Sequence, residues 1–150
     1  WEYKLQWMKR LRDKLDRDFA TDLPLLLCGD TNVAIDDADV ANPEKWCKSV
    51  LCAQPARDAL ASIIDWGLTD VFRVKNPVGG MYSWWDYRQL AFPKGDGLRI
   101  DHILASPPIA DKCTSSEIDR DERKGKQPSD HAPVIAVFDV SPTTPSPWAP

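Results

Sequence analysis

The feature that most constrains the fold is the stretch LPLLLCGD at residues 23–30. It is a short apolar run that ends at Gly29, and such a run is typical of a strand buried on both faces. We therefore expect Cys28 to be a small core residue, and Gly29 to permit a sharp turn of the backbone. A strand of this kind needs partners, and further strand patterns occupy residues 69–74, 81–85, 98–106, 112–118 and 134–140.

Two segments have the periodicity of amphipathic helices. Residues 2–19 place apolar side chains at helical spacing, with charged side chains between them. Residues 55–65 begin at a proline and stop just before Gly67, which is the usual order of helix signals. Residues 31–53 are polar and irregular, which indicates a long functional loop. Mixed helices and strands predict an α/β or α+β fold in which helices pack against a mixed sheet.

Composition limits the classes of function. The net charge of −4 argues against nonspecific coating of DNA. It does not exclude an enzyme that has a locally basic groove. No apolar run approaches the roughly 20 residues of a membrane-spanning helix, so we expect no membrane association. The four cysteines form no C-x-x-C pair or zinc-like spacing. We interpret them as free thiols, which favours a reducing cytoplasm.

Chemistry-bearing residues gather in a few short motifs. Asp30 follows the first strand in the motif GDTN, and an aspartate there also suits an ordinary strand-to-loop turn. Asp101 lies in the middle of an apolar strand pattern, where an unpaired carboxylate would cost several kcal/mol by order of magnitude. His131, in the motif SDH, could pair with it, although taken alone it suits a surface histidine. His102 should point to the opposite face and have a structural role.

The segment SWWDYR at residues 83–88 adds aromatic side chains beside a basic one. Such a combination can stack on sugars or bases, but alternation along a strand must also turn one of the two tryptophans into the core. We further expect Arg88, Lys94 and Arg99 to line one substrate groove. The whole set is rich in oxygen ligands, which suit Mg²⁺ or Mn²⁺, and metal-assisted phosphoryl transfer to water is the chemistry that such a set supports.

These motifs, in this order, resemble the exonuclease III family of apurinic/apyrimidinic endonucleases, within the endonuclease/exonuclease/phosphatase superfamily. The resemblance runs to Phe138 and is carried by LLLCGDTNVA, NPEKW, MYSWWDYR, GLRIDHILAS and KQPSDHAPV. It implies a four-layer α/β/β/α sandwich, of which residues 1–139 would be the C-terminal half and residues 140–150 a proline-rich flexible tail. It also implies magnesium-dependent hydrolysis of DNA, as a 3′–5′ exonuclease and an abasic-site endonuclease acting in DNA repair.

The resemblance assigns roles to individual residues. Asp30 would orient or deprotonate the attacking water, and Asn32 would hold that water or the phosphate. Asp101 would pair with His131, whose imidazole would stabilise charge on the phosphate. The resemblance also implies that Asp130 lies at the metal site and that Trp84 packs against the sugar of the substrate.

The family fold has a first half that supplies a glutamate ligand and a tyrosine. The chain opens directly into a helical pattern, so we expect a fragment that lacks this half, is nearly inactive alone and exposes an apolar sheet face. The missing half and double-stranded DNA with abasic sites or 3′ ends would be its partners. Two alternatives stay open: a noncatalytic DNA-binding or assembly module, and a superfamily phosphodiesterase acting on lipids or inositol phosphates.

Overall fold

The computed structural model describes residues 1–140, so the predicted tail lies almost entirely outside the described residues. The helices are α1 (Glu2–Asp18), α2 (Pro43–Trp46), α3 (Gln54–Ile64), α4 (Val71–Lys75), α5 (Ala91–Lys94) and α6 (Pro107–Ala110). The strands are β1 (Leu26–Asp30), β2 (Thr69–Asp70), β3 (Asp101–Ala105), β4 (Cys113–Ile118) and β5 (Val134–Phe138). The α+β class is confirmed, as are the helices predicted at 2–19 and 55–65 and the strands at 112–118 and 134–140.

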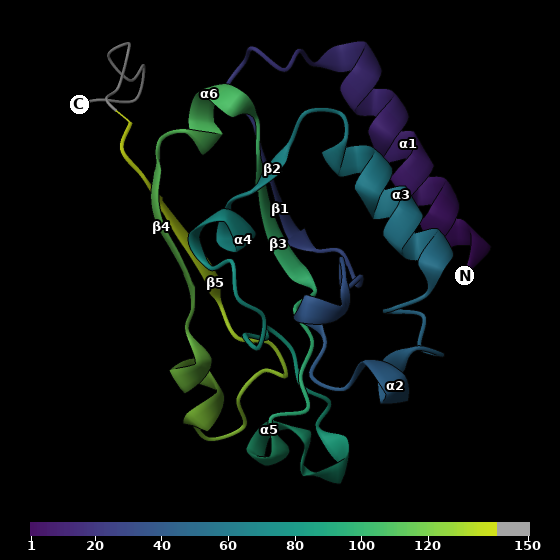
Figure 1. Cartoon of the computed structure of the whole chain (residues 1–150), viewed down its shortest axis with the longest axis vertical. Helices are drawn as coiled ribbons and strands as arrows, with labels where there is room; N and C mark the ends of the chain where they lie inside the picture. Colours follow the sequence, from purple (N-terminus) through teal and green to yellow (C-terminus); the bar gives the residue numbers. More distant parts are fainter. Residues whose placement is uncertain (141–150) are drawn as a thin grey trace.

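Two antiparallel sheets run side by side in the centre of the molecule (Figure 1). One has the strand order β1-β3-β2, and the other pairs β4 with β5. The β1–β3 register sets Cys28 opposite Ile103 and Asp30 opposite Asp101. Every ladder in the described part of the chain is antiparallel. Because β1 pairs with β3 alone, it is an edge strand.

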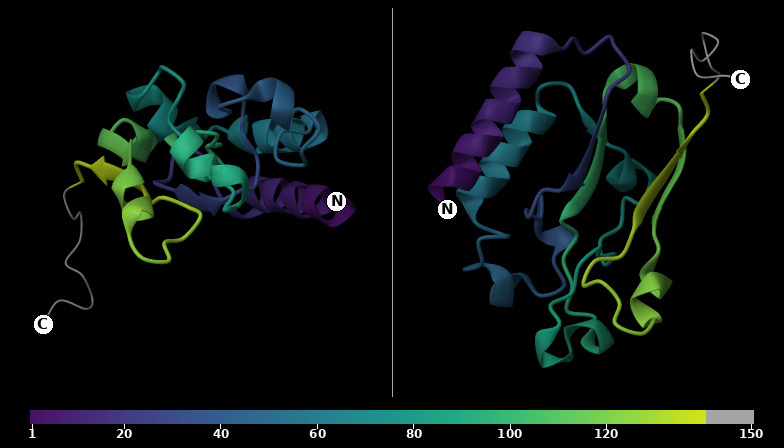
Figure 2. Two further views of the ribbon diagram at one scale, coloured as in Figure 1. Left: turned by 90° about the horizontal axis from the view of Figure 1, so that it is seen from below. Right: turned by 180° about the vertical axis from the view of Figure 1, so that it is seen from behind.

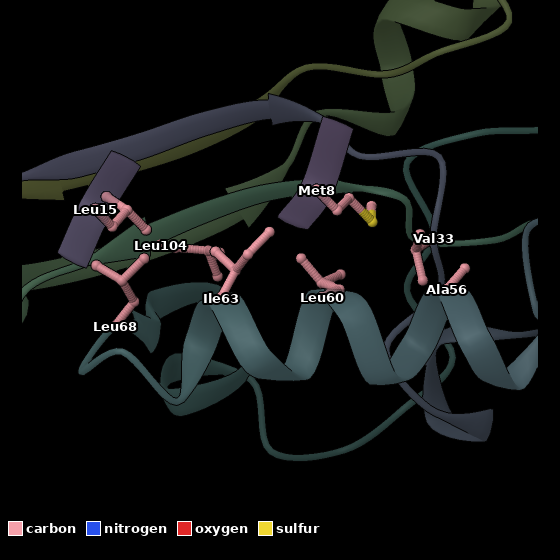
Figure 3. Close-up of a cluster of buried hydrophobic side chains, with 8 residues drawn as sticks. All are labelled: Met8, Leu15, Val33, Ala56, Leu60, Ile63, Leu68 and Leu104. Atoms are coloured by element: carbon pink, nitrogen blue, oxygen red, sulfur yellow. The ribbon is translucent and has the colours of Figure 1, made fainter. Parts of the chain in front are cut away.

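The main core lies between helices α1 and α3 and strand β3. Helix α1 contributes Met8 and Leu15, and β3 contributes Leu104 (Figure 3). Leu60 and Ile63 of α3 are each about 1% exposed and point into the same cluster. This packing explains the helical spacing of the apolar residues in both helices, since each helix buries one face.

Within residues 1–140, no helix lies across the opposite face of the strands. Seen from behind, β1, β3 and β5 run unobstructed, whereas α1 and α3 lie to one side (Figure 2). Side chains alternate along β5: Ala136 and Phe138 pack in a core cluster, while Ile135 and Val137 are exposed. Strand β1 is largely exposed as well, and the prediction that it is buried on both faces is wrong because only its Leu27 side packs against the core, whereas Leu26 and Cys28 face outward. Cys28 is accordingly exposed rather than a core residue.

Two other strand predictions are wrong. The segment 69–74 is a strand only at Thr69–Asp70, and then forms helix α4 because the Asp70 carboxylate accepts the backbone N–H of Arg73 as an N-cap. The segment 81–85 makes isolated bridges, in which Trp84 pairs with both Leu98 and His131. The segment 31–53 is irregular apart from short helical turns, as predicted.

Within residues 1–140, no helix is both long enough and apolar enough to cross a bilayer.

Candidate active site

Three segments meet at one end of the paired strands. Asp30 is the last residue of β1, and the ladder places it directly opposite Asp101, the first residue of β3. His131 precedes β5 and is held beside the strands by its bridge to Trp84. Ligand atoms of Asp30, Asp101 and His131 all lie within 4.8 Å of one another. Residues that are distant in sequence therefore form one cluster.

The pair expected between Asp101 and His131 is present. His131 Nδ1 lies 2.8 Å from Asp101 Oδ2. A carboxylate oxygen only accepts, so Nδ1 carries the hydrogen of this bond. The same Oδ2 accepts the hydroxyl of Ser83 at 2.6 Å. Asp101 is thus held by two donors, and its orientation fixes that of the imidazole.

Ser83 has a positioning role that the amino-acid sequence gave no reason to expect. Its side chain is completely buried, and its Oγ accepts the backbone N–H groups of Ile100 at 3.1 Å and Asp101 at 3.2 Å. It therefore ties the start of β3 to the carboxylate that it orients. The only sequence signal for Ser83 is its place as the first residue of the SWWDYR motif.

Asp30 and Asn32 form a compact polar turn. The backbone N–H of Asn32 donates to Asp30 Oδ1 at 2.8 Å, and its side-chain amide donates to Oδ2 at 2.9 Å. Asn32 has a left-handed backbone with φ of 52°, which asparagine tolerates better than most residues. Across the cluster, His131 Nε2 lies 3.9 Å from Asp30 Oδ2. That nitrogen is therefore left facing the Asp30 carboxylate and the open side of the site.

Lys4 of α1 reaches this turn. Its Nζ donates to the Asn32 carbonyl oxygen at 2.5 Å. Burial lowers the pKa of Lys4, and the nearby Asp30 charge opposes that shift. Among the sequence motifs nothing pointed to Lys4, since it lies in an ordinary amphipathic helix.

Asp130 and Trp84 are coupled to each other. The indole Nε1–H of Trp84 donates to Asp130 Oδ2 at 2.9 Å, and the ring of Trp46 makes an edge contact with Trp84 at 5.7 Å between centroids. The neighbouring Trp85 is 1% exposed. The expectation that one tryptophan of the pair faces inward is confirmed, and Trp84 is the half-buried one beside the candidate site.

The three basic residues expected in a substrate groove have different positions. Arg99 is 1% exposed, and its guanidinium is bound to Asp39 and Asp70, so the prediction that it contacts substrate is wrong. Arg88 is exposed and paired with Asp86, and its hydrogen bonds lower the pKa of that carboxyl to about 2. Lys94 is exposed and lines a separate hollow on the surface, together with Lys45, Asn42 and Asp96.

His102 belongs to a closed cluster, which confirms its structural role. It is 2% exposed, with Nδ1 3.1 Å from the Arg99 guanidinium and Nε2 2.9 Å from the Val33 carbonyl. Arg99 can only donate and a carbonyl can only accept, so the ring is the neutral tautomer with its hydrogen on Nε2. Burial and then the Arg99 charge lower the pKa of His102. No nitrogen is left for a substrate.

A hollow of about 500 Å³ opens beside the site. Its lining combines the polar pair with the start of β5, through Asp101, His131, Ala132, Pro133 and Val134, and with β1 through Cys28 and Gly29. Gly29 adopts φ of 144°, a backbone conformation that strains other residues. Two carboxylates and an imidazole that converge beside open space could hold a metal ion, since hard oxygen ligands suit divalent cations.

The fold and this site match one family. The model of the Endonuclease/Exonuclease/phosphatase family matches residues 1–131, and the chain belongs to that family. Exodeoxyribonuclease III of Haemophilus influenzae is 36% identical over 135 residues, which cover 85% of this chain and 51% of the relative.

Solved structures agree. An AP endonuclease from Archaeoglobus fulgidus superposes with a TM-score of 0.89 at 40% identity, over 93% of this chain and 55% of that one. The 3′ phosphatase NExo from Neisseria, bound to a product DNA hairpin, superposes with a TM-score of 0.85 at 41% identity. The match covers 93% of this chain and 54% of that one. This chain therefore spans about half the length of the relatives that it matches, and its fold is part of their α/β sandwich.

Proposed function

We propose that this chain carries catalytic side chains of a DNA-hydrolysing enzyme, of the exonuclease III and abasic-site endonuclease type. The observation that carries the proposal is the convergence of Asp30, Asp101 and His131 from three segments. Support comes from the relatives, which include an exodeoxyribonuclease III and an AP endonuclease. The substrate would be double-stranded DNA with abasic sites or 3′ ends.

The side chains suggest a division of labour in phosphodiester hydrolysis. Asp30 would take a proton from the attacking water, with Asn32 holding the carboxylate in place through its two hydrogen bonds. His131 would donate a hydrogen bond from Nε2 to a phosphate oxygen as negative charge grows there. Asp101, oriented by Ser83, would keep the imidazole in position and favour its charged form. Trp84 would pack against the substrate sugar.

The proposed cation is Mg²⁺, with Mn²⁺ as the other candidate. Asp130 is the ligand that the family resemblance implies, and the converging cluster offers further carboxylate oxygens from Asp30 and Asp101, which both ions accept. Such an ion, when bound, neutralises charge on the phosphoryl oxygens. Asp130 is kept near the site by its bond from Trp84. A direct check is isothermal titration of this chain with MgCl₂ or MnCl₂, in which an Asp30→Asn variant should bind either cation more weakly.

The remaining partner would be the other half of the family fold. Two observations support it: the chain spans about half of its relatives, and Ile135 and Val137 are exposed on the face that no helix crosses. Closing that face would bury apolar surface, which favours association. We propose that the chain alone is nearly inactive and that supplying the upstream half in trans restores cleavage. A cytoplasmic location is also proposed, and the absence of disulfides among the four cysteines supports it.

Substitution of Asp30 tests the proposed function. With the upstream half supplied, Asp30→Asn should lower the single-turnover rate on an abasic-site duplex by about 100-fold or more, because the proton acceptor is lost. DNA affinity should be kept or rise, since the amide is similar in size and shape and removes a negative charge that repels the phosphate. Asp13→Asn, on the exposed side of α1, is the control and should cleave normally. Normal cleavage by Asp30→Asn would remove the proposal, and DNA binding without any cleavage by the unmodified pair would favour a noncatalytic module.

The Neisseria structure supports a second candidate activity, removal of a 3′ phosphate. The same catalytic groups would serve, because attack of water on a terminal phosphate needs the same charge stabilisation. The products separate the two activities. A 3′-phosphorylated duplex would release inorganic phosphate with its strand intact, whereas an abasic duplex would be nicked.

A further inference from the structure

A site for a phosphodiester needs a cation, and the arginines and lysine expected from the sequence do not supply one at the cluster itself. Arg99 is buried in ion pairs, and Arg88 is paired with Asp86. Lys94 lines a different hollow. Apart from the proposed metal ion and His131, the cluster offers only the carboxylates of Asp30 and Asp101, and these repel a phosphate.

Lys4 is the lysine that reaches the cluster. Its Nζ bonds the carbonyl oxygen of Asn32, and the same Asn32 bonds both carboxylate oxygens of Asp30. The ammonium has three N–H groups, and in the described part of the chain one of them is used. Two donors therefore stay available beside the candidate catalytic turn.

The rest of α1 shows that Lys4 differs from its neighbours. Lys9, Arg12 and Lys14 are each paired with the aspartate four residues further on, namely Asp13, Asp16 and Asp18. The residue four positions after Lys4 is Met8, which is 1% exposed in the core. Lys4 is thus without a helical ion-pair partner, and it makes no ion pair within residues 1–140. The helix directs this one charge to the site.

We propose that Lys4 binds a nonbridging oxygen of the substrate phosphate while its bond to Asn32 holds the Asp30 turn in place. The inference deepens the proposed function, on which it rests, by naming the side chain that recognises the anionic group. The arrangement places the Lys4 ammonium beside the Asn32 end of the Asp30 turn. Lys4 would then add affinity for the phosphate without taking part in proton transfer.

The test is fluorescence anisotropy of a labelled abasic-site duplex, with Ca²⁺ in place of Mg²⁺ to prevent cleavage and with the upstream half present. Lys4→Met should weaken binding about tenfold and reduce the slope of log K against log salt by about 0.9. Lys4→Arg should keep most of the affinity. Lys9→Met is the matched control, because it removes the same charge from the same helix at an exposed, paired position. It should leave both the affinity and the slope nearly unchanged.

A second measurement covers the case in which Lys4→Met does not fold, as judged by circular dichroism. At constant pH, addition of TpT, which contains one phosphodiester, should shift the ¹³Cε resonance of Lys4 and leave that of Lys9 in place. Equal DNA binding by Lys4→Met and Lys9→Met, or an unmoved Lys4 resonance while the unmodified protein binds DNA, would overturn the role of Lys4 alone. Absence of DNA binding by the unmodified protein would overturn the proposed function, and this inference with it.

Discussion

The two histidines of this chain occupy opposite kinds of polar cluster. His102 lies in a closed one, where Arg99 and the Val33 carbonyl use both ring nitrogens and the side chain is buried. His131 lies in an open one, where Asp101 takes Nδ1 and Nε2 faces the exposed carboxylate of Asp30. The clusters adjoin, because Asp101 and His102 are consecutive in β3.

The difference lies in how many hydrogen-bonding positions each cluster leaves unused. In the closed cluster, Asp39 is completely buried and bound by both Arg99 and Arg73. Every charge there has a fixed partner, as buried charges require. In the open cluster, two carboxylates face each other across one rung of the ladder, an arrangement that destabilises a sheet unless a cation or a proton intervenes. The first arrangement favours stability, and the second favours binding and chemistry.

The strongest way to break the closed cluster is Arg99→Met. It leaves Asp39 and Asp70 partly or wholly uncompensated in the interior, and we expect the free energy of unfolding to fall by ~3–5 kcal/mol. Urea unfolding followed by tryptophan fluorescence measures this. Arg17→Met breaks an exposed pair with Asp18 and should have no measurable effect. A loss for Arg99→Met as small as that of the control would show that the cluster does not support the fold.

Replacing each histidine in turn by glutamine sharpens the comparison between the two clusters. His131→Gln should change the unfolding free energy by less than about 1 kcal/mol, yet lower single-turnover cleavage by about 100-fold when the upstream half is supplied. His102→Gln should show the reverse order, with a loss of about 1–3 kcal/mol in stability because Arg99 or Val33 loses its buried partner. Similar stability losses in both variants would contradict the division into open and closed clusters.

The smallest expected effect is a pH dependence that belongs to His102. Its folded pKa is lowered by burial and by Arg99, below the unfolded value of 6.5. Between these two values the unfolded chain binds a proton that the folded chain does not. The His102 contribution is therefore fully present above pH 6.5 and is lost as pH falls towards the folded pKa, with a slope of at most about 1.4 kcal/mol per pH unit. Urea unfolding at pH 5.5 to 7.5 should show this slope in the unmodified protein. If the same slope persists in His102→Gln, another group causes the pH dependence.

The sequence predicted those parts of the fold that have strong local patterns. Helices α1 and α3 follow from apolar spacing, and β4 and β5 are short segments that contain β-branched residues. The segment at Val71 and Phe72 reads as a strand for the same reason, but both side chains are buried in succession on a helical turn that Asp70 caps. A local propensity was overridden there by a cap and by tertiary packing.

For the candidate site, the motifs identified the side chains and left their surroundings unknown. Asp101 could be picked out because a carboxylate within an apolar strand pattern needs a partner, and His131 could supply it. Asp30 on its own suited an ordinary turn, and its role came from the family resemblance. The burial of Arg99 could not be predicted, since its partners Asp39 and Asp70 come from distant loops. Lys4 and Ser83 were missed because their contacts with the site residues are made only by the folded chain.

The β1–β3 ladder joins segments that leave the ribosome at well-separated times. Strand β1 is synthesised before β3, which is its only partner in the described structure. At ordinary rates of synthesis, the apolar stretch before Asp30 therefore stays unpaired for several seconds. An unpaired apolar strand edge is prone to aggregate. A chaperone that binds extended apolar segments would bind β1 during this interval, and Asp30 would pair with Asp101 only after the chaperone had dissociated.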